Sequence, residues 1–469
     1  MNDLDFAYRL YFDYDNYFES SLPNRRTKHS DILALIERLH KSNIFSVNEI
    51  GKSVLGKEIF LISAGTGKTK IFLWSQMHGD ESTATRAIFD IFNFFLSNDN
   101  MSDFKNKLLE KTTIYIMPMV NPDGAEIFQR SNFFNFDVNR DFARLQTPEA
   151  KILKATFDLI KADFGFNLHD QSRLYSAGHN FKQATISLLA PPFDVENSLN
   201  DIRIRSMMLS GKIFSIISSF IPGHIARYSD EYEPRAFGDN FQKLGTSTIL
   251  IESGGWKNDP EKLFVRKINF ITLLSAFKSI QEGSYLNESL ETYNSIPLNQ
   301  KDLFDLVIRN LKINNNGFEY LIDIGINREE INCESEIGFY VKSIIEDTGD
   351  LSVYFGYEDF DLTGMEISIG KTYPVLFESI KEIENLDFHS LHSQGYTNVI
   401  LKNKNFIGEY SPLPINIITD QNIIQNEIKS GTSANLVIIK DRQVKYIILN
   451  GFLIEPLVSD NYLINGTIN

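Results

Sequence analysis

The run IFLWSQMHGDESTATRAIF, residues 71–89, joins a β-strand to a helix through a short polar turn. Residues 71–74 form a continuous apolar segment, which is typical of a strand that is buried on both faces. A helical spacing of apolar residues follows from about residue 82 to residue 96. At the turn between these two elements, His78 and Glu81 stand three positions apart. This order predicts an α/β domain whose polar side chains gather at the carboxyl end of a strand.

The alternation of strands and helices continues on both sides of this run. Further strands are expected at 58–62, 113–119, 163–168 and 246–252, and further helices at 31–41, 149–161, 202–220 and 260–282. Strands that alternate with helices are typical of parallel sheets whose two faces are covered by helices. The predicted fold class is therefore α/β, with a mixed, mostly parallel sheet flanked by helices.

The chain of 469 residues is longer than one hydrophobic core usually organises, so two domains are expected. The periodicity stops around residues 283–299, which are polar and rich in turn-forming residues. We therefore predict a catalytic domain at 1–285 and a β-rich accessory domain at 286–469. One helix is expected at 302–311, and the remainder has the short apolar runs and Asn, Gly and Asp turns of β-structure.

The composition excludes some classes of partner. The formal net charge is -15 at pH 7, whereas nucleic acids and anionic membranes need a basic protein surface. No segment approaches the roughly 20 apolar residues of a membrane span. Cys333 is the single cysteine, so no internal disulfide can form, and residues 1–6 are acidic and lack the apolar region of a secretory signal. These features predict a cytoplasmic protein.

A second histidine occupies a similar position in another strand. Residues 163–168 form an apolar strand, and His169 follows directly. His78, Glu81 and His169 together provide two imidazoles and one carboxylate as metal ligands. A catalytic zinc site uses three protein ligands of this kind and leaves its fourth tetrahedral position open. Each residue also has a simpler explanation, since Glu81 would suit the first turn of a helix and either histidine could be structural. The sequence therefore predicts a zinc site only when the three are taken together.

Two other segments carry polar residues that could act on a substrate. Asn139 and Arg140 are adjacent, and a guanidinium matches a carboxylate with two hydrogen bonds to which Asn can add a donor. The alternative for a lone Arg is a surface salt bridge. Glu252 follows the apolar strand 246–251 and could serve as a general base for water on zinc. Its alternative is an exposed acid at a strand terminus.

In this order, these segments resemble the zinc carboxypeptidase family. Its pattern is His-x-x-Glu, then Asn-Pro-Asp-Gly with a following Arg, then Asp-x-Asn-Arg, a strand-end His and a Glu after an apolar strand. The matching elements here are His78 to Glu81, Asn121 to Gly124 with Arg130, Asp137 to Arg140, His169 and Glu252. The resemblance covers roughly residues 51–282 and implies the carboxypeptidase fold for that part of the chain.

The resemblance also implies how the metal would be held. Zinc would be ligated by His78, Glu81 and His169. Asp137 would accept a hydrogen bond from His78 and so fix the tautomer of that ligand. Zn²⁺ is therefore the expected cofactor.

The remaining matched residues would act on a peptide. Arg130 would polarise the scissile carbonyl and stabilise the developing oxyanion. Asn139 and Arg140 would hold the free C-terminal carboxylate of the substrate. Glu252 would activate the water on zinc and then pass a proton to the leaving amine.

The resemblance is incomplete in the interval before Glu252. Digestive members of the family carry a Tyr on a mobile loop there, and in this sequence Tyr228 and Tyr232 are the candidates. The interval 226–239 is rich in charge. We therefore expect a substrate other than a simple hydrophobic C-terminus.

Three functions remain open at this stage. The leading hypothesis is a metallocarboxypeptidase that hydrolyses the C-terminal amide bond of a peptide. The second is a zinc amidase or deacylase that acts on N-acyl amino acids, as aspartoacylase-like enzymes do with a similar metal set and an Asn-Arg pair. The third is a binding module with a degenerate site. The Asn-Pro-Asp-Gly run with Arg130 favours the carboxypeptidase.

Overall fold

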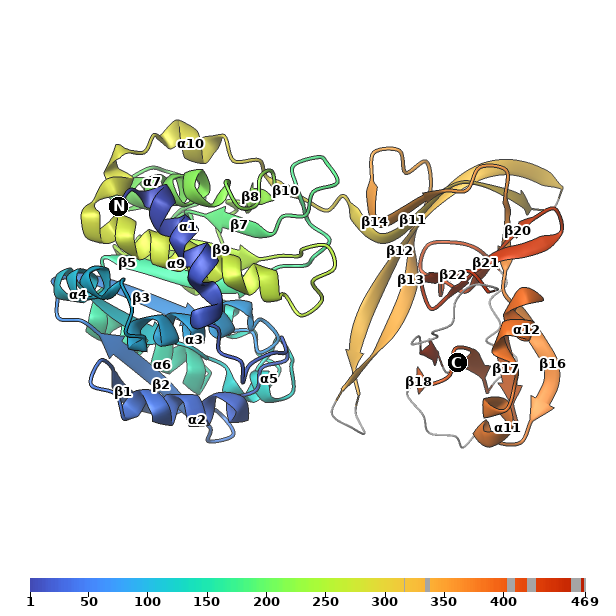
Figure 1. Ribbon diagram of the computed structural model, residues 1–469, viewed down its shortest axis with the longest axis horizontal. Coiled ribbons are helices and arrows are strands. Elements are labelled where there is room, and N and C mark those ends of the chain that lie inside the picture. The colour runs from blue at the N-terminus through green and yellow to red at the C-terminus, as the bar shows by residue number, and fades with distance from the viewer. Residues whose placement is uncertain (316, 334–337, 403–409, 420–426, 457–464, 468–469) are drawn as a thin grey trace. The chain divides into compact units, whose positions relative to one another are not determined.

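The computed structural model describes residues 1–315, 317–333, 338–402, 410–419, 427–456 and 465–467 (Figure 1). The chain divides into two compact units, Met1–Lys301 and Asp302–Asn469. The sequence placed the boundary earlier, after residue 285. The difference arises because α10 (Leu290–Asn294) packs against α7 (Asp201–Ile217), and β10 (Asn299–Gln300) pairs with β6 (Ser176–Ala177), both within the first unit.

An eight-stranded mixed sheet forms the centre of the first unit, in the order β1-β2-β4-β3-β5-β9-β7-β8. Its strands are β1 (Ser46–Lys52), β2 (Glu58–Ala64), β3 (Thr69–Ser75), β4 (Thr112–Met117), β5 (Phe164–Asp170), β7 (Ile186–Leu189), β8 (Ile225–Arg227) and β9 (Ser247–Ser253). The four central strands β4, β3, β5 and β9 run parallel, whereas β1–β2, β2–β4 and β7–β9 pair antiparallel. The predicted mixed, mostly parallel sheet is confirmed.

Helices cover both faces of this sheet. The larger core contains apolar residues of α1 (Asp3–Asp13), α2 (His29–His40), α3 (Thr83–Leu96), α4 (Ser102–Lys111), α7 and α9 (Leu263–Glu282). The smaller core contains those of α6 (Pro148–Ile160) and α8 (Phe237–Lys243). The other helical segments are η1 (Tyr14–Asn16), α5 (Pro122–Glu126), η2 (Val138–Arg140) and η3 (Ser284–Asn287). Burial on both faces explains why the central strands are continuous apolar runs.

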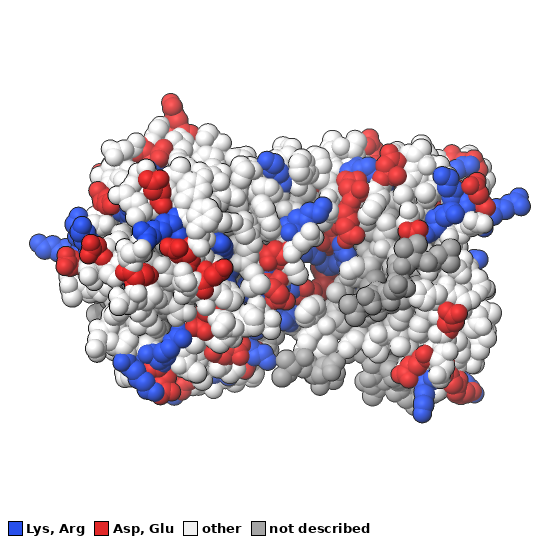
Figure 2. Space-filling model, viewed as in Figure 1, with Lys and Arg blue, Asp and Glu red and all other residues white. Residues whose placement is uncertain are grey.

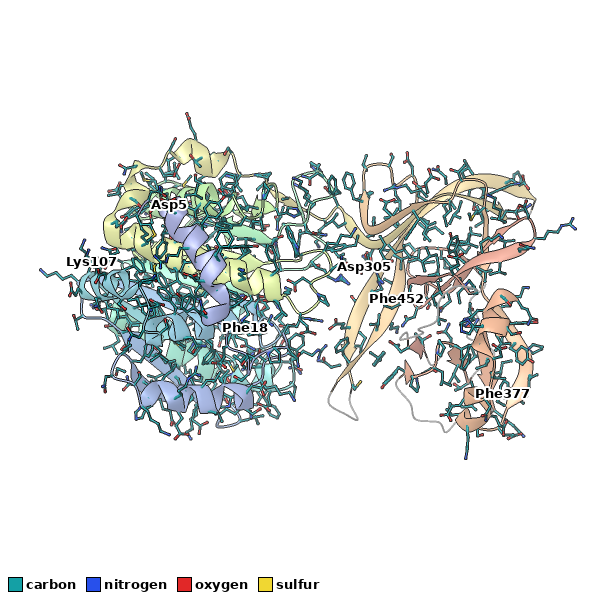
Figure 3. All side chains as sticks on the ribbon, in the orientation of Figure 1. Asp5, Phe18, Lys107, Asp305, Phe377 and Phe452 are labelled. Carbon is teal, nitrogen blue, oxygen red and sulfur yellow. The ribbon has the colours of Figure 1, made fainter. Side chains whose placement is uncertain are left out.

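A buried ion pair ties the N-terminal segment to this core. Arg266 on α9 and Asp90 on α3 are both fully buried, and the Arg266 Nε lies 2.7 Å from the Asp90 Oδ2. The Tyr14 hydroxyl donates to the same carboxylate oxygen at 2.8 Å. The Arg266 guanidinium lies over the ring of Phe18, which is labelled in Figure 3, at 4.3 Å from its centroid. Removal of one partner from such a pair typically costs about 3–5 kcal/mol.

The second unit consists mainly of β-strands, as predicted for the C-terminal part of the chain. Its largest sheet has the order β13-β12-β11-β15-β20-β21-β22, with β14 on β11; a second has the order β16-β17-β19, and β18 pairs with β23. The strands are β11 (Leu303–Asn315), β12 (Phe318–Asn332), β13 (Phe339–Gly349), β14 (Phe355–Asp361), β15 (Glu366–Ile369), β16 (Lys371–Phe377), β17 (Tyr396–Leu401), β18 (Tyr410–Ser411), β19 (Asn416–Ile418), β20 (Leu436–Lys440), β21 (Gln443–Leu449), β22 (Phe452–Ile454) and β23 (Gly466–Thr467). Two short helices, α11 (Ile380–Glu384) and α12 (Phe388–Ser393), complete it.

The helix predicted at 302–311 is wrong, because this segment forms most of β11. Its apolar residues at 303, 304, 306, 307, 308 and 311 are buried, and most of them fit a helical spacing. Both faces of the strand are covered, because Leu306, Ile308 and Leu311 belong to one core cluster and Phe304 and Val307 to another. A bulge between Ile308 and Leu311, with Asn310 in the left-handed region at φ 59°, also interrupts the alternation. The bulge shifts the register by one residue, so the strand loses its simple alternation.

Acidic and basic side chains are interspersed on the face shown in Figure 2. Among the described residues, no helix is long and apolar enough to cross a bilayer.

Candidate metal centre and active-site cleft

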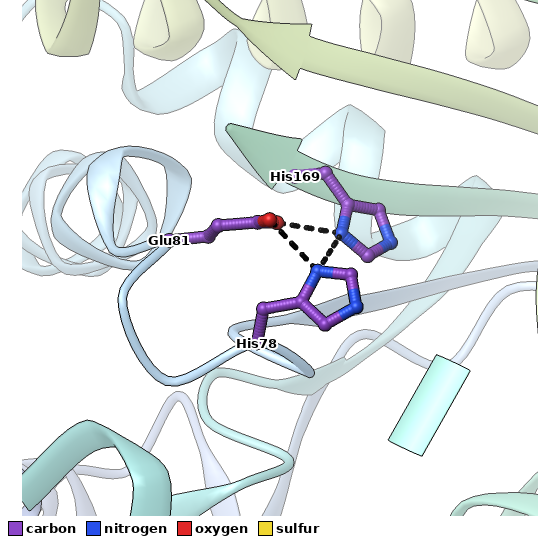
Figure 4. A group of neighbouring side chains, drawn as sticks. All are labelled: His78, Glu81 and His169. Carbon is purple, nitrogen blue, oxygen red and sulfur yellow. Dashed lines mark hydrogen bonds and ion pairs between the residues drawn. The ribbon is translucent and has the colours of Figure 1, made fainter. Parts of the chain in front are cut away.

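The structure brings His78, Glu81 and His169 together in one buried group (Figure 4). The His78 Nδ1 lies 2.8 Å from Glu81 Oε1, and the His169 Nδ1 lies 2.7 Å from Glu81 Oε2. The two Nδ1 atoms are 3.2 Å apart. One ligand atom from each residue lies within 4.8 Å of the others, so the predicted grouping is confirmed.

The strand register explains how residues 91 positions apart meet. β3 and β5 pair in parallel with Ser75 opposite Leu168, so the segments that follow both strands leave the sheet at the same edge. The turn after β3 is tight, because Gln76 has φ 52° and its amide donates to the Gly79 carbonyl at 2.8 Å. A Cβ on Gly79 would lie 2.0 Å from the Gly124 carbonyl carbon. Glycine is therefore required where this turn passes the start of α5.

The electrostatics of the group suit a cation. Burial alone would raise the pKa of Glu81, but the two facing imidazoles hold it well below its usual value. Burial lowers the pKa of His169. Burial would also lower the pKa of His78, yet Glu81 and Asp137 outweigh this effect and raise it to about 9. Two imidazole nitrogens and one carboxylate converge without intervening protein atoms, which is the ligand set of a catalytic zinc site.

Asp137 and Arg130 surround this group. The Asp137 Oδ1 lies 3.0 Å from the His78 Nε2, on the side of the ring away from Glu81. Arg130 donates to Asp137 Oδ2 through Nε and Nη2, at 3.2 and 3.0 Å, and to Glu81 Oε1 through Nη1 at 3.1 Å. Burial opposes ionisation of Asp137, but the His78 hydrogen bond and the nearby positive charges lower its pKa. The carboxylate of Asp137 can therefore orient the His78 ring.

Asn139 and Arg140 lie in η2, directly after Asp137. The Asn139 N–H donates to Asp137 Oδ1 at 2.9 Å, and its side-chain oxygen accepts from the Phe237 N–H at 3.0 Å. The Arg140 Nη1 donates to the Asn139 carbonyl at 2.9 Å. The Arg140 guanidinium also forms an ion pair with Glu233, in which Nε lies 3.3 Å from Oε2.

Glu252 lies near the end of β9 and pairs in register with His169 on β5. Its carboxylate makes no hydrogen bond or ion pair with any residue that the structure describes. Burial, reinforced by the charge of Glu81, raises the pKa of Glu252 to about 8. A cation held by His78, Glu81 and His169 would offset the charge of Glu81. It would therefore lower the pKa of Glu252, towards the range of a general base.

A cleft of about 360 Å³ joins these residues. All the predicted site residues line it except Asp137, which lies behind His78. Tyr228 lines it too, whereas the Tyr232 ring lies 5.9 Å from the Lys243 ammonium nitrogen.

Sequence reasoning did not single out two acids of the cleft, Glu233 and Asp239. Burial raises the pKa of Asp239 to about 7. The charge-rich interval 226–239 contains both acids, but a loop gives no periodicity that indicates which side chains face inwards.

Residues 32–182 match the model of a known protein family, whose description is zinc carboxypeptidase. Over this segment the chain is therefore similar to the zinc carboxypeptidase family. Carboxypeptidase M of Mus musculus is 30% identical over 117 residues, which are 22% of this chain and 26% of the relative. A probable carboxypeptidase 2 of Arthroderma benhamiae is 30% identical over 151 residues, 32% of this chain and 27% of the relative. The chain thus matches about a quarter of the length of these relatives.

Two solved structures also show partial similarity to the chain. A metallo-carboxypeptidase from Burkholderia cenocepacia has a TM-score of 0.45 and 15% identity, over 55% of this chain and 69% of the other. Bovine thrombin-activatable fibrinolysis inhibitor, in a complex with tick carboxypeptidase inhibitor, has a TM-score of 0.45 and 14% identity. The match covers 55% of this chain and 97% of the other.

Proposed function

We propose that this protein is a zinc metallocarboxypeptidase that hydrolyses the C-terminal amide bond of a peptide. The observation that carries this proposal is one cleft that contains the three metal ligands, a buried carboxylate and two arginines. A binding module would not need a buried acid beside the metal ligands, since burial of an unpaired carboxylate is costly.

His78, Glu81 and His169 would hold the zinc ion. When bound, zinc supplies a Lewis acid that polarises a carbonyl and makes water more acidic. Asp137 keeps the His78 Nδ1 directed at the ligand group, because it engages the opposite ring nitrogen.

The protein's own groups would then carry the proton and the charge. Glu252 accepts a proton from the attacking water at a carboxylate oxygen and returns it to the departing amine. The Arg130 guanidinium lies beside Glu81 and can donate to the oxygen that becomes negative. Asn139 and Arg140 bind the terminal carboxylate and so place the last peptide bond in the cleft.

The proposal is tested on the zinc-loaded protein with peptides that differ only at the C-terminus. Free-acid peptides should be cleaved, and matched C-terminal amides should not. Glu252→Gln should keep its zinc and lose kcat by roughly 10²–10⁴-fold, the usual contribution of a general base. The matched control is Glu37→Gln, an exposed acid on α2. Equal cleavage of amides would contradict the proposal, and faster cleavage of N-acyl amino acids than of peptides would favour the deacylase.

A further inference from the structure

Glu233 places a carboxylate of the protein itself on the arginine that is assigned to the substrate carboxylate. Glu233 lies between β8 and α8 and lines the cleft. Its Oε2 is 3.3 Å from the Arg140 Nε. The same carboxylate accepts two hydrogen bonds from the Arg235 guanidinium, from Nε at 2.9 Å and from Nη2 at 2.8 Å. One carboxylate is therefore shared by two guanidinium groups.

The backbone holds Glu233 at this position. Its N–H donates to Asp239 Oδ1 at 3.0 Å, and its carbonyl accepts from the Ala236 N–H at 3.0 Å. The Arg235 carbonyl accepts from the Phe142 N–H at 3.2 Å, close in sequence to Arg140. The Glu233 Oε1 also accepts from the Arg235 backbone N–H at 3.1 Å. The side-chain oxygen of a glutamine can accept the same bond, so replacement of the Glu233 carboxylate by an amide should keep the turn.

The charges favour this contact in the free protein. Arg235, followed by Arg140, lowers the pKa of Glu233 to about 2, so its side chain is ionised throughout the neutral range. The Arg140 and Glu233 side chains are 36% and 27% exposed. An ion pair with this exposure is weak enough to exchange partners, because water competes for both charges.

We propose that Glu233 competes with the substrate for Arg140 and thereby sets the affinity for a terminal carboxylate. This inference rests on the proposed function, since it assigns Arg140 to that carboxylate. When a peptide enters, its carboxylate takes the Arg140 Nε, and Glu233 stays paired with Arg235 alone. Arg140 keeps its bond to the Asn139 carbonyl, so its guanidinium stays oriented during the exchange.

Two substitutions should move the affinity in opposite directions. Glu233→Gln removes the competitor, so KM for a free-acid peptide should fall roughly two- to fivefold, the range of a partly exposed ion pair. Among the residues that the structure describes, Arg235→Gln leaves Arg140 as the cationic partner of Glu233, so KM should rise by a similar factor. The double variant should resemble Glu233→Gln, because Arg235 acts only through Glu233.

The experiment measures kcat, KM and zinc content for the full chain at low salt and at about 0.5 M salt. The Glu233→Gln effect should shrink at high salt, because screening weakens the ion pair. Glu37→Gln, which removes an exposed acid paired with Lys41, should leave KM unchanged. A rise in KM for Glu233→Gln would overturn the inference and show that Glu233 positions Arg140. An unchanged KM would also overturn the inference.

A second measurement does not depend on turnover. Calorimetry would compare the binding of a cleaved free-acid peptide and its matched C-terminal amide to zinc-loaded Glu252→Gln, with and without Glu233→Gln. Binding of the acid should tighten two- to fivefold in the double variant, and binding of the amide should not change. If the parent shows no preference for the acid, the proposed function fails and the inference with it. If the parent prefers the acid and Glu233→Gln has no effect, the inference alone fails.

Discussion

The metal-ligand group and the Arg140–Glu233 pair share one cleft but are built differently. His78, Glu81 and His169 are at most 7% exposed, and strand register and mutual hydrogen bonds hold them. Arg140 and Glu233 are several times more exposed and belong to η2 and to a loop. A metal would therefore meet a group that is already organised, whereas on the proposed function a substrate carboxylate would have to displace Glu233 from Arg140.

The largest effect is expected from the buried group. His169→Ala should abolish stoichiometric zinc binding and lower turnover at least a thousandfold, because two ligands hold zinc far less well than three. His40→Ala, which removes an exposed histidine on α2, is the control. Metal analysis and steady-state kinetics provide the measurement. Retention of one zinc per chain in His169→Ala would assign the metal to other residues.

A smaller effect is expected at Asp137, which contacts the ligand His78. Asp137→Asn keeps the shape of the side chain but weakens the hydrogen bond that orients His78. Zinc affinity should fall roughly 10–100-fold, the usual effect at this position. Competition with a chelator measures it, with Asp158→Asn on α6 as an exposed control. An unchanged affinity would mean that strand register alone orients the His78 ring.

The affinity of the protein for zinc should rise with pH. The pKa of His78 is about 9 without metal, above its ordinary value, so zinc must displace a proton at neutral pH. Zinc affinity should therefore rise with pH, by up to about tenfold per unit, and level off near pH 9. Metal titrations at pH 6.5, 7.5, 8.5 and 9.5 test this dependence. A flat profile would show that His78 is neutral in the metal-free protein.

The smallest effect is expected at the exchangeable pair. Arg140→Lys keeps the charge but removes the planar fork, so KM for a free-acid peptide should rise roughly five- to tenfold with zinc content unchanged. Steady-state kinetics against the matched amide isolates the contribution of the carboxylate. An equal loss for acid and amide would show that Arg140 supports the cleft and does not read the carboxylate.

The metal site was predictable because each of its residues is attached to a regular element. His78 and His169 follow apolar strands, and parallel pairing then brings them together. The position of Glu252 beside His169 was not predicted from strand pairing; it follows from the sheet order, in which β9 is the other neighbour of β5.

Other features were not predictable from local patterns. The contact of Glu233 with Arg140 joins two irregular segments 93 positions apart, and no periodicity reports such a pair. The apolar residues of β11 resemble those of a helix because both faces of the strand are buried and the bulge at Asn310 interrupts the alternation. In both cases the outcome depends on tertiary contacts that a window of sequence does not contain.

The position of β9 in the sheet has a consequence for synthesis on the ribosome. β9 lies between β5 and β7, yet it is made about 60 residues after β7, and it alone joins β7 and β8 to the rest of the sheet. A nascent chain that ends before residue 247 would hold His169 on a strand whose edge towards β9 is open and apolar. Such a chain would contain His78, Glu81 and His169 but not Glu252, so on the proposed function it could bind a metal before it could hydrolyse a peptide.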